Sequence, residues 1–286
     1  MKHKQHISHV IELNLGMLFM STSGVLGRFI EMAPPVTIWW RCLLAAFFLT
    51  LFCWRWNVSL KIHHKRDLAT ILIGGLFLGG HWVTYFYALQ YSSIAIGMLS
   101  LFTYPVITAF LEPILLKTKF QPVHIVLAIL VMTGIYLLAP SFSIENDYTK
   151  GILLGLISSL MYSLRNLLLK NRAKTYHGSA LMFYQMIIVI TALAPVLMIY
   201  DGVMLTEQWP AVVTLALITT AIGHTLFVIS FKHFSISTAS IISSIQPIYG
   251  IILGIIFLNE IPGWNTVIGG ILILTTVVIE SVRSYK

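Results

Sequence analysis

Ten stretches of the chain are apolar over about 20 residues each, the length that an α-helix needs to cross the hydrocarbon layer of a membrane. Only 10% of the residues are charged, whereas soluble domains carry about 25%. The sequence therefore predicts an all-α polytopic membrane protein with short connections and no soluble domain. The stretches lie at roughly 10–30, 35–55, 68–90, 93–116, 121–140, 149–169, 178–200, 209–231, 235–258 and 263–282.

Basic residues are distributed unequally between the two sides of this predicted bundle, as the positive-inside rule requires. With a cytoplasmic N-terminus, the inner side collects Lys2, Lys4, Arg55, Lys61, Lys65, Arg66, Lys117, Lys119, Lys170, Arg172, Lys174, Lys232, Arg283 and Lys286. The outer side collects Lys150 and the acids Glu31, Glu145, Asp147, Asp201, Glu207 and Glu260. Every loop fits ten transmembrane helices with both termini cytoplasmic. The net charge of +8 then reflects orientation in the bilayer and not nucleic-acid binding, which gathers basic residues on one patch.

Cys42 and Cys53 are the two cysteines of the chain. They lie in one apolar stretch, about 16 Å apart at helical rise, which is beyond the reach of a disulfide. We interpret them as packing residues. The basic N-terminus resembles the start of a signal peptide, but no clear cleavage site follows, so we expect it to begin a retained first span.

An internal repeat divides the chain into two halves. Sliding residues 87–116 along residues 229–258 aligns Pro105 with Pro247, and a similar comparison sets Arg41 beside Gln185. We predict a first repeat at 1–140, an outer connecting loop at 141–148 and a second repeat at 149–286. Because five helices per repeat is an odd number, the two five-helix repeats must be inverted, as in many secondary transporters that work by alternating access.

Two prolines lie inside predicted spans. Proline lacks a backbone N–H and disrupts the hydrogen bond to the carbonyl four residues earlier, and in hydrocarbon such a loosened carbonyl needs a polar neighbour. We therefore predict helix kinks at Pro105 and Pro247, with Tyr104 and Gln246 beside them lining a central cavity. The alternative is that these prolines bend the helices for packing alone.

Arg41 is the arginine that lies deepest within a predicted span, and intramembrane charges are candidates for function. It is either a charge of the cavity, an anchor at the interface or a partner in a link between helices. Arg28 and Arg165 lie near the ends of their spans, so we interpret them as snorkelling or positive-inside residues.

Three further titratable residues lie within predicted spans. Glu112 is about one turn from Lys117, so it forms a local ion pair or, if buried, serves as a proton-coupling carboxylate. His81 and His224 occupy nearly matching positions of the two repeats. Histidine titrates near neutral pH, so this pair is a candidate for proton coupling or substrate contact, with hydrogen-bonded packing as the plain alternative.

The predicted substrate cavity gathers these polar residues, with aromatic walls nearby. Small residues at four-residue spacing favour close helix packing and occur as Gly75 with Gly79, Gly151 with Gly155, and Gly250 with Gly254. Trp82, Tyr87 and Tyr184 add aromatic surface of the kind that suits small organic solutes. The predicted lining is Arg41, His81, Tyr85, Tyr104, Gln185, His224 and Gln246.

The segments ALQYSSIAIGMLSLFTYPVITAFLEPIL and FKHFSISTASIISSIQPIYGIILGIIFLNE resemble the paired EamA domains of the drug/metabolite transporter superfamily. The second segment ends with the family's acid at Glu260, whereas Thr118 stands where the acid of the first repeat would fall. Arg41 resembles an arginine that the family places early in its second helix. The resemblance implies a plasma-membrane transporter of a metabolite or drug-like molecule, most often an exporter of amino acids or related compounds, with a small-molecule substrate and the lipid bilayer as partners. Members of the superfamily also carry nucleotide sugars, purines and other solutes, so the substrate class stays open.

Other functions find less support in the sequence. An intramembrane enzyme would carry a motif such as H-E-x-x-H or a G-x-S nucleophile site, and a channel would carry a polar stripe or charged ring; the sequence has none of these. It also lacks a Walker A loop, so we expect no ATP, metal or other cofactor. Protons are a candidate coupling partner, facilitated diffusion is the alternative, and the protein is either a monomer or a homodimer.

Overall fold

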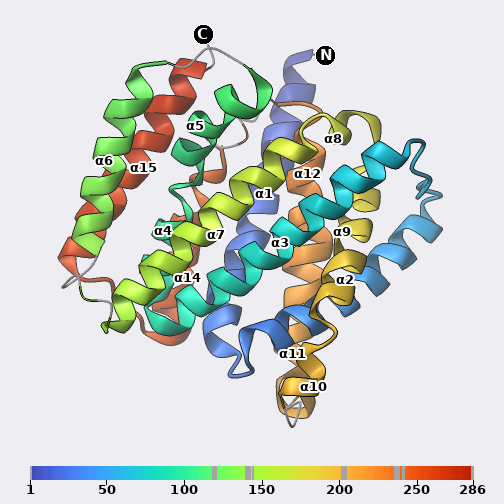
Figure 1. The fold of residues 1–286 in the computed structure, drawn as a ribbon, viewed down its shortest axis with the longest axis horizontal. Coiled ribbons are helices and arrows are strands. Elements are labelled where there is room, and N and C mark those ends of the chain that lie inside the picture. The colour runs from blue at the N-terminus through green and yellow to red at the C-terminus, as the bar shows by residue number, and fades with distance from the viewer. Residues whose placement is uncertain are drawn as a thin grey trace.

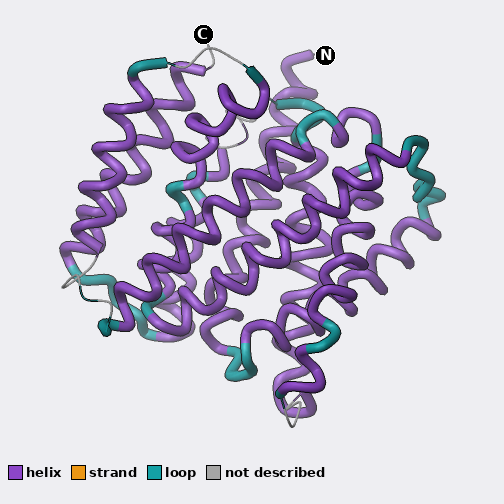
Figure 2. The backbone as a smooth tube through the Cα atoms, in the orientation of Figure 1, coloured by secondary structure: helices purple, strands orange, loops and turns teal. Residues whose placement is uncertain are grey.

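The computed structural model describes residues 2–117, 121–138, 143, 145–200, 205–234, 239 and 242–284. Throughout these residues the chain is helical, with connecting turns and no strand (Figure 2). The predicted all-α class is therefore confirmed. The helices are α1 Lys2–Phe29, α2 Pro34–Arg55, α3 Lys65–Tyr91, α4 Ile94–Leu101, α5 Tyr104–Leu116, α6 Val123–Leu138, α7 Asp147–Leu169, α8 Arg172–Thr175, α9 Gly178–Leu193, α10 Val196–Ile199, α11 Leu205–Thr214, the π-helix η1 Leu215–His224, α12 Thr225–Ser230, α14 Gln246–Leu258 and α15 Trp264–Ser284.

Seven helical segments among the described residues are long and apolar enough to cross a membrane. Three further apolar helices are shorter, at Val123–Leu138, Gln246–Leu258 and Trp264–Ile279. Each of the ten predicted stretches therefore contains an apolar helix, while a count of ten complete crossings stays a prediction. The longer segments are Ser8–Phe29, Pro34–Arg55, Lys65–Tyr91, Ile94–Leu115, Asp147–Leu169, Gly178–Ile199 and Glu207–Ser230.

The helices pack side by side in a single bundle with two distinct ends (Figure 1). The start of α1, the end of α5 and the short α8 lie at one end, together with the turn between α2 and α3. We name it the basic end, after Lys61, Lys65, Lys170 and Arg172. The end of α1, the start of α7 and the end of α14 lie at the other end, which we name the acidic end, after Glu31, Asp147 and Glu260.

Helices from the two halves of the chain interleave throughout the bundle. The most extensive packing joins α3 to α7, and further pairs are α6 with α15, α2 with α9, and α1 with η1 and α14. In Figure 1, α1 runs from the basic end to the acidic end, whereas α7 runs in the opposite direction.

Pro105 marks a complete break in the helix rather than the predicted kink. α4 ends at Leu101, Phe102 and Thr103 form a turn, and α5 begins at Tyr104. Pro247 likewise occupies the first turn of α14, after a turn at residues 244–245. Proline suits this position because the first N–H groups of a helix have no intrahelical partner to lose. The two prolines thus start new helices inside the bundle.

A second departure from the prediction lies at residues 209–231, which we expected to form one regular helix. The segment consists of α11, the π-helix η1 and α12. Long π-helical runs are rare, and single wide turns of this kind often occur at functional sites. Within η1, the Thr220 hydroxyl donates to the Leu215 carbonyl oxygen at 3.0 Å, a contact across five residues that suits the wider helix.

The predicted close packing at glycines is confirmed. A Cβ atom added to Gly75 would lie 3.1 Å from the Cα atom of Gln185 and would overlap the side chain of Ile188. On α7, a Cβ atom on Gly155 would approach the Ser100 Cβ atom to 2.5 Å. The missing side chains therefore let α3 and α9, and α7 and α4, approach each other closely.

We predict that Gly75→Ala lowers the free energy of unfolding by about 1–3 kcal/mol through overpacking. Gly74→Ala is the matched control, because its Cβ atom would lie 3.7 Å from Leu169, an ordinary contact, and alanine favours a helix by up to about 1 kcal/mol over glycine. Thermal unfolding followed with a thiol-reactive dye reports on both variants, since Cys42 and Cys53 are free and buried. Equal unfolding temperatures for the two variants would contradict the packing role of Gly75.

Candidate substrate cavity

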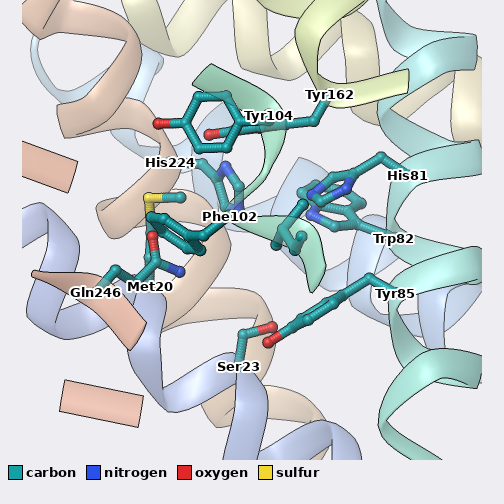
Figure 3. Close-up of a pocket in the computed structure, with 11 residues that line it drawn as sticks. Met20, Ser23, His81, Trp82, Tyr85, Phe102, Tyr104, Tyr162, His224 and Gln246 are labelled. Atoms are coloured by element: carbon teal, nitrogen blue, oxygen red, sulfur yellow. The ribbon is translucent and has the colours of Figure 1, made fainter. Parts of the chain in front are cut away.

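A small enclosed cavity lies where the helix breaks meet the centre of the bundle (Figure 3). Its volume is about 20 Å³, enough for one water molecule. It is therefore a closed site that must widen before a solute enters. Its lining is Met20, Ser23, His81, Trp82, Tyr85, Leu101, Phe102, Tyr104, Tyr162, His224 and Gln246.

The lining comes from α1, α3, α4, α5, α7, η1 and α14, and from Phe102 in the turn between α4 and α5. Tyr104 is the first residue of α5 and Gln246 is the first residue of α14. Both helices therefore begin at the cavity. In α5, Pro105 has no N–H group and the Val106 N–H donates to the Thr103 carbonyl oxygen at 3.1 Å. The positive ends of two helix dipoles are directed into the same small volume.

His81 is held in a defined state by α7. The hydroxyl of Ser158 lies 2.7 Å from His81 Nδ1 and donates to the His81 carbonyl oxygen at 2.9 Å. A hydroxyl has one proton, so both contacts form together when Nδ1 carries a proton and donates to Ser158. This leaves Nε2 as the ring nitrogen that is free to accept a hydrogen bond or a proton.

Aromatic rings form most of the cavity wall. Tyr162 lies with its ring centre 5.0 Å from that of Tyr104 and 4.6 Å from that of His81. On the facing side, the hydroxyl ends of Tyr85 and Ser23 point toward each other (Figure 3). The wall is thus flat and apolar with polar tips, as in sites for small organic molecules.

Arg41 lies directly behind this wall and is fully buried. Its Cζ atom is 3.9 Å from the centre of the Trp82 ring, and its Nε atom donates to the Thr220 hydroxyl at 2.6 Å. The terminal nitrogens Nη1 and Nη2 have no hydrogen-bond partner within the part of the chain that the structure describes. Arg41 therefore adjoins the cavity without lining it.

Our interpretation of Arg165 as a snorkelling or positive-inside residue was wrong, because Arg165 is fully buried. The helices α3, α4 and α5 pack against α7 and cover Arg165, although the sequence places it near the end of a span. Its Nε atom donates to Gln185 Oε1 at 2.9 Å, and Nη1 donates to Asn166 Oδ1 at 3.0 Å. Gln185 thus binds Arg165 and does not line the cavity.

An ion pair lies near each end of the bundle. At the acidic end, Arg28 Nε lies 2.9 Å from Glu260 Oε1, and Glu260 Oε2 accepts a hydrogen bond from the backbone N–H of Ile94 at 2.8 Å. At the basic end, Lys170 Nζ lies 2.9 Å from Glu112 Oε1. Glu112 therefore pairs with Lys170 rather than with Lys117, and it lies outside the cavity lining.

The basic end has a further polar cluster around Asp67, near the start of α3. The Tyr176 hydroxyl donates to Asp67 Oδ2 at 2.7 Å, and Arg172 Nε lies 3.0 Å from Asp67 Oδ1. The hydrogen bond to the Asp67 carboxylate raises the pKa of Tyr176, because ionisation would place a second negative charge beside it. This cluster ties the start of α3 to the segment between α8 and α9.

Five of the seven predicted cavity residues line one cavity: His81, Tyr85, Tyr104, His224 and Gln246. Arg41 and Gln185 lie outside its lining, and Trp82 is the one further predicted aromatic that belongs to it. Tyr184 instead donates its hydroxyl to the Leu60 carbonyl at 2.9 Å, and Tyr87 stacks with Tyr91.

The sequence interpretation missed Met20, Ser23, Leu101, Phe102 and Tyr162, which complete the lining. A signal for two of them was present in the repeat. The shift that aligns Pro105 with Pro247 also aligns Met20 with Tyr162, so a search for paired positions on the first helix of each repeat would have found both.

Comparisons with known proteins agree with this architecture. The profile of the EamA-like transporter family matches residues 10–139 and again residues 149–281. An uncharacterized transporter of Archaeoglobus fulgidus is 26% identical over 196 residues, which cover 68% of this chain and 70% of the relative. A crystal structure of another protein superposes with a TM-score of 0.71 at 18% identity and covers 96% of this chain and 97% of that chain. At that identity the likeness concerns the fold alone.

We predict that Gln185→Leu lowers the free energy of unfolding by about 1.5–3 kcal/mol, because the buried Arg165 cation loses a hydrogen-bond acceptor. Gln185→Glu is the matched control; it keeps an acceptor oxygen and adds a compensating charge, so we expect it to be no less stable than the wild type. Thermal unfolding in detergent compares the three proteins. Wild-type stability of Gln185→Leu would show that the contact is not needed.

Proposed function

The chain belongs to the EamA-like transporter family, and we propose that it is a secondary transporter that moves a small organic solute across the plasma membrane by alternating access. The observation that carries the proposal is the closed cavity at the start of two broken helices, with an ion pair at each end of the bundle. Transporters of several folds bind their solutes at such interrupted helices near the bilayer midplane.

The packing of the helices supports an inverted repeat as the basis of the mechanism. α1 packs against η1 and α14, and α7 packs against α3 and α5, which are the corresponding helices of the other repeat. α1 and η1 pack closely at Gly16 and Gly223, where a Cβ atom on Gly223 would lie 3.3 Å from the Gly16 carbonyl oxygen. The equivalent contact of α7 and α3 is between Ser158 and His81. The α1–η1 and α7–α3 interfaces are thus equivalent in the two repeats. Such a pair suits a transporter with two equivalent states, each of which is open to one side of the membrane.

The basic partners of the two end ion pairs are related by the repeat, whereas the acids Glu112 and Glu260 are not. The shift that aligns Pro105 with Pro247 places Arg28 on Lys170. Arg28 pairs with Glu260 of the second repeat, and Lys170 pairs with Glu112 of the first. We infer that each pair holds one end closed and that breaking one pair at a time opens the cavity to one side.

We propose export of amino acids or related compounds as the direction and first substrate class to test, following the family resemblance. The basic end then faces the cytoplasm, as the positive-inside rule indicates. His81 and His224 line the cavity, whereas Glu112 is engaged with Lys170. These two histidines are therefore the residues that we favour for proton coupling, and facilitated diffusion is the alternative.

Reconstitution into liposomes tests transport itself. We expect purified protein to accelerate the movement of at least one solute from a panel of amino acids, purines and sugars, relative to protein-free vesicles. Parallel measurements with and without a pH gradient distinguish proton coupling from facilitated diffusion. If every solute moves at the protein-free rate, the proposal is wrong.

The end closures generate a second prediction. In a protein with Cys42 and Cys53 replaced by alanine and Ser23→Cys added as a reporter in the cavity, Glu260→Gln should speed alkylation from the acidic side. Glu112→Gln should speed it from the basic side. Partly exposed ion pairs contribute up to about 1 kcal/mol, so we expect an acceleration of up to about fivefold.

Glu145→Gln is the matched control for the acidic end, because Glu145 is exposed there and belongs to neither closure. It should leave the alkylation rate unchanged. Acceleration from the same side in both Glu260→Gln and Glu112→Gln would contradict the assignment of one closure to each end.

A further inference from the structure

The two fully buried arginines, Arg41 and Arg165, have no acidic partner among the residues that the structure describes. Four of the described acids are engaged in ion pairs elsewhere, and a fifth, Glu12, contacts His9 at 3.4 Å. The ion pairs are Asp67 with Arg172, Glu112 with Lys170, Asp147 with Lys150, and Glu260 with Arg28. The centre of the bundle is therefore positively charged, which is costly for a site surrounded by hydrocarbon.

The two arginines differ in how well their hydrogen bonds are satisfied. All three nitrogens of Arg165 have partners, namely Gln185, Asn166 and the sulfur of Met182. Arg41 uses Nε alone, and both of its terminal nitrogens have no partner in the described structure. A buried polar group is nearly always hydrogen-bonded in a native protein, so an exception needs an explanation.

Packing on aromatic rings compensates only part of this cost. The guanidinium carbon of Arg41 lies 3.9 Å from the centre of the Trp82 ring and 5.8 Å from that of Phe86. A cation–π contact stabilises a buried ion by less free energy than its desolvation costs, and it provides no hydrogen-bond acceptor for the N–H groups. The free Nη1 and Nη2 atoms therefore point to a ligand.

We propose that the transported solute is an organic anion whose carboxylate binds the two terminal nitrogens of Arg41, an inference that rests on the proposed transport function. Two parallel N–H groups match the two oxygens of a carboxylate, a geometry that lysine lacks. The Nε atom is held by Thr220, so the guanidinium is oriented before the solute arrives. The solute's flat apolar part packs among the aromatic rings of the cavity.

The helix termini at the cavity favour the same charge. His224 Nδ1 has no hydrogen-bond partner in the described structure and is open to a hydrogen bond with the solute in the direction that its tautomer sets; its ring meets that of Trp82 edge-on at 5.1 Å. α5 and α14 direct their positive N-terminal ends into the cavity. Of the residues that line the cavity, none is acidic, so a solute ammonium group finds no countercharge there. The site therefore selects for net negative charge.

Trp82 controls access to Arg41. Its ring lines the cavity, and the guanidinium lies against the same ring. Because the cavity holds about 20 Å³, a carboxylate reaches Arg41 only after the cavity widens and the Trp82 side chain moves aside. Solute binding is thus coupled to the opening that alternating access requires.

Ligand-dependent thermal unfolding of the purified wild-type protein tests the charge preference without any variant. The probes share one ring and differ in charge: 3-phenylpropanoate is an anion, phenylalanine is a zwitterion and 2-phenylethylamine is a cation. At tenfold excess over its dissociation constant, a bound ligand should raise the unfolding temperature by several degrees. We expect the largest rise with the anion, a smaller rise with the zwitterion and none with the cation.

Substitution of Arg41 tests the assigned residue. We expect Arg41→Met to abolish the anion-induced rise while leaving the ligand-free unfolding temperature unchanged or higher, because it removes an uncompensated buried charge. The Thr220 hydroxyl stays satisfied through Leu215. Arg41→Lys should retain at most a tenth of the affinity, since it keeps the charge without the paired N–H groups. Arg66→Gln is the control and should keep the full response, because Arg66 is exposed at the start of α3 and belongs to neither end ion pair.

The outcomes separate this inference from the proposed function. Reconstituted protein that transports a neutral or cationic solute, with Arg41→Met as active as the wild type, would overturn the anion assignment and leave transport intact. A marked fall in the ligand-free unfolding temperature of Arg41→Met would make Arg41 a structural residue and also overturn it. Absence of transport for anionic, neutral and cationic solutes alike would remove the proposed function instead.

Discussion

The structure depends on the absence of water from the hydrocarbon layer, which obliges every buried polar group to find a partner within the protein. Helices satisfy this requirement for the backbone, and serine and threonine hydroxyls mostly bond to carbonyls of their own helix, as Thr84 and Thr50 do. Buried polar atoms without a hydrogen-bond partner in the described structure include Trp40 Nε1, Tyr85 Oη, Ser100 Oγ and Thr225 Oγ1, as well as His224 Nδ1 and the Arg41 nitrogens Nη1 and Nη2. The Arg41 nitrogens differ from the others named here because they belong to a fully buried cation. The Arg41 guanidinium and the His224 ring both lie beside Trp82. The groups that are open to a solute therefore lie together at the centre of the bundle.

The two helix breaks have a purpose in this setting. A continuous helix would keep its polar termini at the membrane surface, whereas a helix that begins at Tyr104 or Gln246 has the positive end of its dipole deep inside the bundle. Close packing at glycines then brings both starts to one cavity. The prolines that start these helices and the glycines that let helices pack closely therefore together place the small cavity at the centre of the bundle.

Much of this architecture is predictable from the sequence, because hydrophobic length and loop charge act locally. The all-helical class and the positions of the apolar helices follow from them, and the repeated prolines indicate where the cavity lies. The depth of individual side chains does not follow, since it depends on which helices cover a given face. Arg165 illustrates this limit: it lies near Lys170 in the sequence, yet α7 is enclosed by neighbours. The expectation that Glu112 pairs with a residue nearby in the sequence was wrong for the same reason. Its partner, Lys170, approaches it only through tertiary packing.

The π-helix at Leu215–His224 holds more residues per turn than the α-helices on either side. Successive residues of an α-helix are separated by about 100° around its axis, so moving the wide turn by one residue rotates the side chains it passes by about that angle. Thr220, which orients Arg41, and His224, which lines the cavity, both lie on this segment. A shift of the wide turn along this segment would therefore rotate both residues about the helix axis. The helix would neither unfold nor slide along its length through the lipid.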